Sequence, residues 1–168
     1  MKTSFDTPTF VAQARIDTPL GPLTAAATAR GLAGLWFDGQ KHHPGRLDAP
    51  AAQADPLFDL LEAGLNAYFK GQVLPQDLPI HPQGTPFQRS VWQALLEIPA
   101  GESRSYGELA ARLGKPGSAR AVGAAVGRNP VSILIPCHRV LGADGSLTGY
   151  AGGLERKKAL LTLEGLAP

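Results

Sequence analysis

The segment from Ile135 to Val140, with the sequence Ile-Pro-Cys-His-Arg-Val, constrains the fold of this chain more than any other and contains its single cysteine. Residues 131–135 are an almost entirely apolar run, which predicts buried chain. Pro136 has a fixed φ and no amide donor, so the segment cannot be ordinary helix interior. These features predict that a buried stretch delivers Cys137 to a turn.

The chemistry open to Cys137 depends on its neighbours. A thiol becomes a good nucleophile as its thiolate, and a nearby histidine or cation lowers its pKa from roughly 8.5. His138 is adjacent in sequence, but adjacency does not place a base within reach of the sulfur. A lone cysteine is most often a small buried hydrophobic residue. A nucleophile and a core residue are therefore both possible at this point.

Composition indicates a globular protein. The chain has 168 residues, of which 43% are hydrophobic and 18% charged, and this suits one domain or two small lobes that share a core. No stretch approaches the roughly 18 to 20 apolar residues of a membrane span, and residues 1–6 lack the apolar region of a signal peptide. A single cysteine cannot form an internal disulfide, which predicts a cytoplasmic protein. It also argues against a cysteine-rich metal site.

The N-terminal part is predicted to be a small antiparallel sheet with one helix. The segments 10–16, 23–28 and 31–37 have the pattern of strands. Asp55 and Pro56 form a favourable helix start, and the helix should continue to about Gly71 with an apolar stripe formed by Leu57, Leu60, Leu61, Leu65 and Tyr68. His42 and His43 lie in a loop and are predicted to be exposed. We interpret residues 1–72 as a scaffold lobe without chemistry, followed by a linker over 73–84.

Residues 85–168 are predicted to form a mainly helical lobe, which makes the fold class α+β. Thr85 with Gln88, and Ser105 with Glu108, match the capping-box pattern at two helix starts. Ser118 is predicted to cap a third helix that runs to about residue 128. The two short helices joined by residues 114–117 predict a DNA-binding helix-turn-helix or an αα-hairpin without a DNA role. A hairpin over 141–147 and a last helix over 154–163 complete the lobe.

Small residues dominate the third of these helices. Glycine in a helix interior costs about 1 kcal/mol relative to alanine, so Gly123 indicates either close helix packing or close approach to a nucleic-acid backbone. Major-groove readers usually present long polar side chains to base edges, and this helix has almost none. The pattern favours sequence-independent binding in a narrow groove. The net charge of +2 is weak support for nucleic acid by itself.

Together these segments resemble the O6-alkylguanine-DNA alkyltransferase family. The match comprises Pro-Cys-His-Arg-Val and, in the family's order and spacing, the segments 104–106, 118–123, 128–130 and 149–154. It covers residues from about 85 to 164. The resemblance implies DNA repair by direct transfer of the alkyl group from O6-alkylguanine, and from O4-alkylthymine, to Cys137. The transfer would occur once per molecule, because the product is a stable thioether, and it would need no cofactor or metal.

The resemblance also implies roles for individual residues. Cys137 would be the nucleophile, His138 a base acting through a water, and Glu164 the group that orients His138. Tyr106 would bond a ring nitrogen of the flipped base and help to turn the 3′ phosphate, and Arg120 would fill the gap that the flipped base leaves. A structural role follows for Asn129, which would tie the end of the recognition helix to the cysteine turn.

The same resemblance also implies two larger sets of residues, one that binds DNA and one that forms the base pocket. The minor groove of duplex DNA would be bound by a monomer through Tyr106, Ser118, Ala119, Arg120, Ala121, Gly123 and Arg128. The flipped base would lie in a pocket formed by Val140, Leu147, Gly149, Tyr150, Ala151 and Gly152. Many members have serine at the position of Ala151, and a backbone N–H contact to the guanine O6 survives that change while a hydroxyl contact does not.

Two other hypotheses remain. The chain could bind damaged DNA without chemistry, with Cys137 incidental, but related non-catalytic binders replace the active-site cysteine, often with tryptophan. A Cys-His-Glu hydrolase unrelated to DNA would need turnover and an oxyanion hole. That hypothesis leaves the helix-turn-helix pattern and Arg120 without a role.

Overall fold

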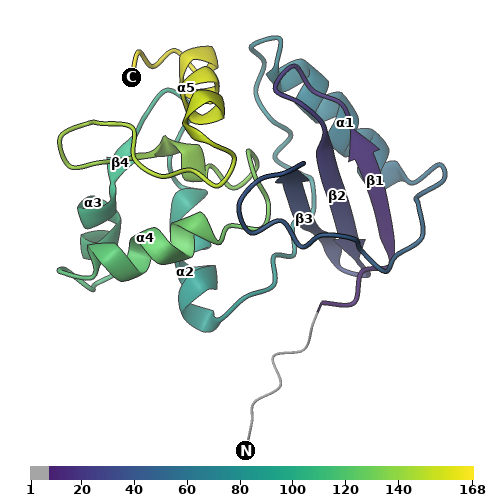
Figure 1. Ribbon diagram of the computed structural model, residues 1–168, viewed down its shortest axis with the longest axis horizontal. Coiled ribbons are helices and arrows are strands. Elements are labelled where there is room, and N and C mark those ends of the chain that lie inside the picture. Colours follow the sequence, from purple (N-terminus) through teal and green to yellow (C-terminus); the bar gives the residue numbers. More distant parts are fainter. Residues whose placement is uncertain (1–7) are drawn as a thin grey trace, which may run out of the picture.

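A three-stranded antiparallel sheet in the order β1-β2-β3 forms the N-terminal lobe (Figure 1). The structure, a computed structural model, describes residues 8–168, so residues 1–6, used to assess a signal peptide, lie outside this range. The strands are β1 (Ala12–Ile16), β2 (Leu23–Thr28) and β3 (Gly31–Phe37). All three predicted strands are present, although β1 begins two residues later than predicted. With the helical second lobe, the architecture is α+β, as predicted.

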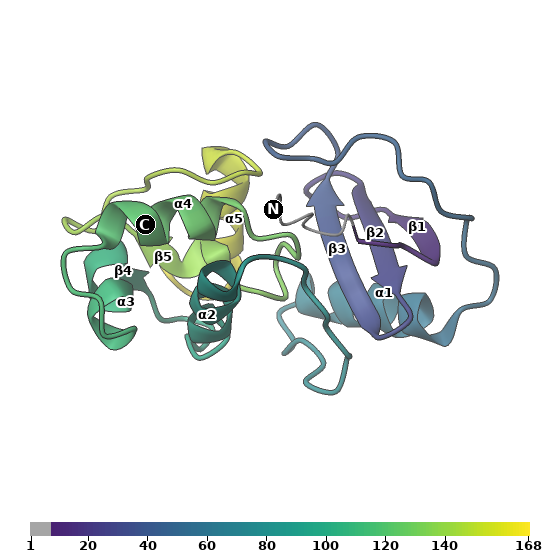
Figure 2. The ribbon, with the colours of Figure 1, turned by 90° about the horizontal axis from the view of Figure 1, so that it is seen from below.

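Helix α1 (Pro56–Tyr68) lies on one face of the sheet (Figure 2). Its start is as predicted, because the Asp55 carboxylate accepts the Leu57 N–H at 2.9 Å and proline occupies the first turn. The predicted apolar stripe is partly wrong. Leu60 is 38% exposed, and the helix buries Phe58 instead, together with Leu61, Leu65 and Tyr68. The spacing of 3, 4 and 3 residues in this buried set keeps it on one face, and Leu57 and Leu60 lie beside that face.

Four helices build the C-terminal lobe: α2 (Pro86–Leu95), α3 (Tyr106–Arg112), α4 (Ala119–Gly127) and α5 (Leu154–Leu163). Both predicted capping boxes are present, at Thr85 and at Ser105. Ser118 occupies the N-cap position of α4, but within the described chain its side chain makes no capping hydrogen bond. The reason is its backbone, with φ −95° and ψ 24°, whereas a capping side chain normally requires an extended N-cap residue.

The predicted hairpin over 141–147 is wrong in its pairing. Strand β5 (Val140–Leu141) pairs in parallel with β4 (Arg104–Ser105), from the segment before α3. The Gly142 N–H still bonds the Ser146 carbonyl at 2.9 Å, which closes a tight turn around Asp144. Within the described range, residues 147–153 form no returning strand. The partner of β5 comes from far earlier in the chain, and a local turn signal carries no information about it.

One hydrophobic core continues through both lobes. On one side of β3, the Leu35 N–H bonds the Pro130 carbonyl at 2.8 Å, and the Ser132 N–H bonds the Leu35 carbonyl at 2.9 Å. The predicted linker also contacts β3, because the Leu32 N–H bonds the Pro79 carbonyl at 2.9 Å. A side chain at Gly31 would lie 2.6 Å from that carbonyl oxygen, so this approach requires glycine. The chain before Cys137 is thus held directly against the N-terminal sheet.

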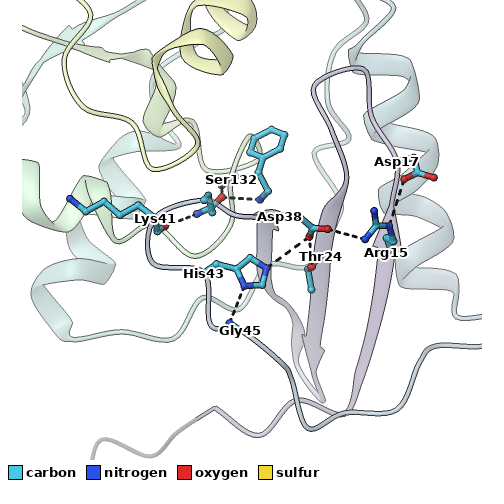
Figure 3. A network of polar contacts seen from close by, with 10 residues as sticks. Arg15, Asp17, Thr24, Asp38, Lys41, His43, Gly45 and Ser132 are labelled. Atoms are coloured by element: carbon cyan, nitrogen blue, oxygen red, sulfur yellow. Dashed lines mark hydrogen bonds and ion pairs between the residues drawn. The ribbon is translucent and has the colours of Figure 1, made fainter.

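The loop after β3 adds a second connection between the lobes (Figure 3). The buried Gln40 Oε1 accepts hydrogen bonds from the Phe37 N–H at 2.8 Å and the Ser132 hydroxyl at 3.3 Å. The Lys41 N–H bonds the Ala151 carbonyl at 2.9 Å. His42 is exposed as predicted, but His43 is half-buried, because its ring packs against Trp36. Within residues 8–168, no helix has the length and apolar character needed to cross a bilayer.

Candidate active site

Two tight turns deliver Cys137 to its position. Residues 131–135 are buried, as predicted. Ile133 has φ 72°, and the Leu134 N–H bonds the Ser132 carbonyl at 2.8 Å, which is the rare and strained γ-turn. Pro136 (φ −81°, ψ 64°) forms the common inverse γ-turn, with the Cys137 N–H on the Ile135 carbonyl at 2.8 Å. Cys137 then begins the 3₁₀ turn η1 (Cys137–Arg139), which confirms the predicted turn.

Asn129 holds these turns to the end of α4. Its side chain is buried and donates to the Ile135 carbonyl at 2.8 Å, and its Oδ1 accepts the Val131 N–H at 3.0 Å. The position matches the structural tie that the sequence resemblance implied for Asn129. The Asn129 side chain also favours the ionised form of Cys137, which acts to lower the pKa of the thiol.

Burial controls the resting state of the thiol. Cys137 is 5% exposed, and this burial raises its pKa, against the opposing influence of the Asn129 side chain and the Lys157 charge. Cys137 is therefore a neutral thiol at rest. The solvation that a buried thiolate would lose outweighs the stabilisation that the Asn129 side chain and the Lys157 charge provide. Reaction requires a base that takes the proton when the sulfur attacks.

His138 and Glu164 form a buried pair. The His138 Nε2 lies 2.8 Å from Glu164 Oε1. Since the carboxylate can only accept, Nε2 carries the proton, and Nδ1 is left as the basic nitrogen. In the described part of the chain, this buried Nδ1 has no hydrogen-bond partner. Burial lowers the pKa of His138, although Glu164 opposes the shift, so the imidazole is neutral and able to accept a proton.

Glu164 receives hydrogen bonds from three side chains. Arg139 donates through Nε to Oε2 at 2.9 Å and through Nη2 to Oε1 at 2.8 Å. The Tyr68 hydroxyl donates to Oε1 at 2.7 Å, and this contact connects α1 with the end of α5. Burial disfavours the charge, but the hydrogen bonds from His138, Arg139 and Tyr68 outweigh it and lower the pKa of Glu164 to about 2. The carboxylate is therefore ionised at neutral pH and can stabilise a protonated His138.

Lys157 was not identified from the sequence. It is fully buried in α5, and its ammonium donates to the carbonyls of Val140, Thr148 at 2.7 Å and Gly149 at 3.2 Å. Burial lowers its pKa to about 8, and Cys137 opposes that shift. Lys157 thus joins the cysteine turn to the loop before α5 and places a cation near the sulfur. Lys157 lies three and four residues before Leu160 and Leu161, which are both buried. This helical spacing was the sequence signal that Lys157 lies on the buried face of the helix.

The predicted base-pocket residues lie on β5 and on the loop that Lys157 holds. Val140 and Gly152 are buried, Leu147, Tyr150 and Ala151 are half-buried, and Gly149 is exposed. Tyr106 reaches the same loop, with its hydroxyl 3.4 Å from the Thr148 carbonyl. A side chain at Gly152 would lie 2.8 Å from the Tyr150 ring, so this glycine permits the loop to close against that ring.

A second cation, Arg156, holds the far side of this loop. Its guanidinium donates to the Gly152 carbonyl at 3.1 Å and to the Leu20 carbonyl at 2.8 Å. It also stacks on Phe37, 4.5 Å from the ring centre. The N-terminal lobe therefore helps to position the loop, a connection that the sequence did not indicate.

The predicted DNA-binding residues lie along α4 and its ends. Arg120, Ala121 and Arg128 are exposed, and Ser118, Ala119 and Gly123 are half-buried. A methyl group at Gly123 would contact only Tyr106, at an ordinary 3.5 Å. Close packing within the protein therefore does not explain this glycine. Within residues 8–168, no three His, Cys, Asp or Glu side chains gather closely enough to hold a metal ion.

The buried Glu164–His138 pair should make the fold sensitive to acid. A carboxyl whose pKa is about 2 when folded and near 4.5 when unfolded stabilises the fold fully above pH 4.5 and loses this contribution as pH falls toward 2. The expected loss is about 3 kcal/mol. His138, whose folded pKa lies below 6.5, adds a loss that begins as pH falls below that value.

Urea unfolding at pH values of about 7, 5 and 3 would measure this dependence. The free energy of unfolding should fall steadily across the series, and most of the fall below pH 4.5 should be absent in Glu164→Gln. Equal free energies for the wild type at the two acidic values would contradict the assignment.

The chain matches known proteins over most of its length. Residues 11–82 match the family model of the 6-O-methylguanine DNA methyltransferase ribonuclease-like domain, and residues 86–166 match that of the DNA binding domain. A methylated-DNA–protein-cysteine methyltransferase of Mycobacterium bovis is 51% identical over 150 residues, which are 89% of each chain. One from Methanosarcina barkeri is 49% identical over 152 residues, covering 89% of this chain and 94% of the relative.

Solved structures show the same similarity. The Mycobacterium tuberculosis OGT in complex with DNA superposes with a TM-score of 0.84 at 48% identity, covering 92% of each chain. The O6-methylguanine-DNA methyltransferase of Pyrococcus kodakaraensis gives a TM-score of 0.64 at 26% identity, covering 92% of this chain and 99% of the other. The chain therefore belongs to the 6-O-methylguanine DNA methyltransferase family, the methylated-DNA–protein-cysteine methyltransferases.

Proposed function

We propose that this protein repairs O6-alkylguanine, and O4-alkylthymine, in duplex DNA by one irreversible transfer of the alkyl group to Cys137. The observation that carries the proposal is the arrangement at the end of the buried 131–135 segment. There a thiol lies on a tight turn, followed directly by a buried imidazole that a carboxylate orients. A member of this DNA methyltransferase family that retains the cysteine is thereby equipped to accept an alkyl group.

The reaction is a displacement at the alkyl carbon. The Cys137 thiol proton passes to His138 Nδ1 through a bridging water as the sulfur–carbon bond forms and the carbon–oxygen bond of the base breaks. Glu164 stabilises the imidazolium, and the Lys157 ammonium stabilises the developing thiolate. The departing guanine takes up one proton, so the products are S-alkylcysteine and guanine. The thioether is stable, and the chain has no second thiol to remove the group, which limits each molecule to one transfer.

DNA binding is proposed to occur in the minor groove through α4. Its small side chains permit close approach, and exposed Arg120 near its start can replace the base that leaves the stack. Tyr106 and the loop over 147–152 would then receive the extruded base. Cys137, His138, Glu164 and Lys157 all come from one chain, which supports action as a monomer.

Intact mass after mixing with a duplex that contains one O6-methylguanine tests the function. We expect the mass of one methyl group, mapped to Cys137, with no further increase when the duplex is in excess. Cys137→Ala should gain no mass and still bind the duplex. Tight binding of wild type to the lesion without a mass change would support a damage-binding protein. Release of product over many turnovers would support a hydrolase.

Replacing Arg120 with alanine should separate base extrusion from chemistry. Repair of O6-methylguanine in duplex DNA should slow by roughly 10- to 100-fold, because the gap left by the base is no longer filled. Reaction with free O6-benzylguanine, which needs no extrusion, should change by less than about twofold. Single-turnover rates on both substrates provide the measurement, and Arg30→Ala, an exposed arginine between β2 and β3, is the control. Equal losses on the two substrates would contradict this role.

A further inference from the structure

Tyr68 brings the N-terminal lobe into contact with the reactive pair. The lobe was predicted to be a scaffold without chemistry, and the stripe pattern assigned Tyr68 only to the core. Its ring does pack in the core, where the residue is 4% exposed. Its hydroxyl, however, donates to Glu164 Oε1 at 2.7 Å, across 96 positions of sequence. This oxygen is the same one that receives the His138 Nε2 contact.

We infer that Tyr68 is a positioning residue for alkyl transfer, which holds the Glu164 carboxylate in the orientation that His138 requires; the inference rests on the proposed function. Arg139 donates one hydrogen bond to each of the two Glu164 carboxylate oxygens. Tyr68 adds a donor from α1, and its packed ring fixes the direction of that donor. The hydrogen bond from the end of α1 to the end of α5 thus sets the geometry of the base that deprotonates Cys137.

The Tyr68 hydroxyl is a permanent donor to this carboxylate. Burial, followed by the charge and hydrogen bond of Glu164, raises the pKa of Tyr68 far above its usual value of 10.0, so the hydroxyl keeps its proton at any physiological pH. A groove of about 830 Å³ runs along the seam between the lobes and reaches Tyr68, Arg139 and Glu164. Water in this groove could replace a lost hydroxyl as a donor but not its fixed direction. The tyrosine therefore provides orientation that solvent cannot supply.

The charged surroundings of His138 determine the sign of the expected pH effect. Glu164 stabilises the imidazolium, whereas Arg139 and Lys157 oppose it, and Cys137 is the adjacent titratable group. In Tyr68→Phe, the Glu164 Oε1 atom loses one hydrogen-bond donor and therefore presents more negative charge to His138. The pKa of His138 should therefore rise. The carboxylate also becomes less well oriented, so the maximum rate should fall although the base becomes stronger.

Single-turnover kinetics of Tyr68→Phe across the pH range tests this inference. At saturating duplex, methyl transfer to Cys137 should slow by about 3- to 10-fold, with benzyl transfer from free O6-benzylguanine slowed by the same factor. Affinity for duplex DNA should be unchanged. The pH at which the rate reaches half its maximum should move upward, and NMR titration of the His138 imidazole should show the same shift. A hydroxyl needed only for stability would move neither the pH profile nor the imidazole titration.

Thr24→Val is the matched control, because it removes a hydroxyl that donates to another carboxylate, Asp38, in the same lobe at 2.9 Å (Figure 3). It should leave the rates and the pH profile at their wild-type values. If wild type transfers the methyl group and folded Tyr68→Phe matches it in rate and pH profile, the inference is overturned while the proposed function stands. If the wild-type protein itself gains no methyl group, the proposed function is contradicted, and the positioning role of Tyr68 is contradicted with it.

Discussion

Lys157→Met is expected to destabilise the fold by about 3 to 5 kcal/mol, because one buried ammonium holds three main-chain carbonyls. Methionine fills similar space but donates no hydrogen bond, so the carbonyls of Val140, Thr148 and Gly149 would lose this partner. The loop before α5 should then separate from the cysteine turn. Chemical denaturation at neutral pH measures the loss directly.

The same substitution should also reduce the reactivity of Cys137. The ammonium favours the thiolate, so its removal should raise the pKa of the thiol further. We expect alkyl transfer from free O6-benzylguanine to slow by roughly 10- to 100-fold at a temperature where the variant is folded. Lys158→Met, which changes the exposed neighbour, is the control and should match wild type. A folded Lys157→Met protein with wild-type reactivity would show that the cation serves structure alone.

Glu164→Gln is expected to have the largest effect on rate, a loss of roughly 100- to 10,000-fold in alkyl transfer. The substitution removes the negative charge that stabilises protonated His138. The glutamine side chain also replaces one accepting oxygen with an NH₂ group, which can only donate. Arg139 and Tyr68 themselves donate to this position, so one of their hydrogen bonds would be lost. Because the Glu164 side chain is 2% exposed, Arg139 would keep a buried charge without its partner, at a cost of about 3 to 5 kcal/mol.

Rates should be compared under conditions in which circular dichroism shows Glu164→Gln to be folded. Glu155→Gln, in the exposed first turn of the same helix, is the control and should transfer the alkyl group at the wild-type rate. Affinity for duplex DNA should not change in either variant. A folded Glu164→Gln protein within about twofold of the wild-type rate would contradict the role of this carboxylate in proton transfer.

Local sequence patterns predicted local structure well in this chain. The three strands, the Asp55–Pro56 helix start and both capping boxes depend on residues a few positions apart, and all are present. Ser118 shows the limit of such patterns, because its residue type suits a cap while the backbone conformation set by the preceding turn does not. The predicted hairpin fails for a related reason. Strand β5 could not be paired from its own neighbourhood, because its partner lies before α3.

The sequence by itself determined the turn at Cys137 and the family, and it predicted Cys137 as the nucleophile, because the cysteine is unique and its motif is contiguous. Only the tertiary structure decided how that cysteine behaves. Burial keeps the thiol neutral at rest, Lys157 crosses from α5 to hold the turn, and Tyr68 reaches Glu164 from the other lobe. These are effects of desolvation and of contacts between distant segments. Neither can be read from residue order, since both depend on which side chains the fold removes from water and brings together.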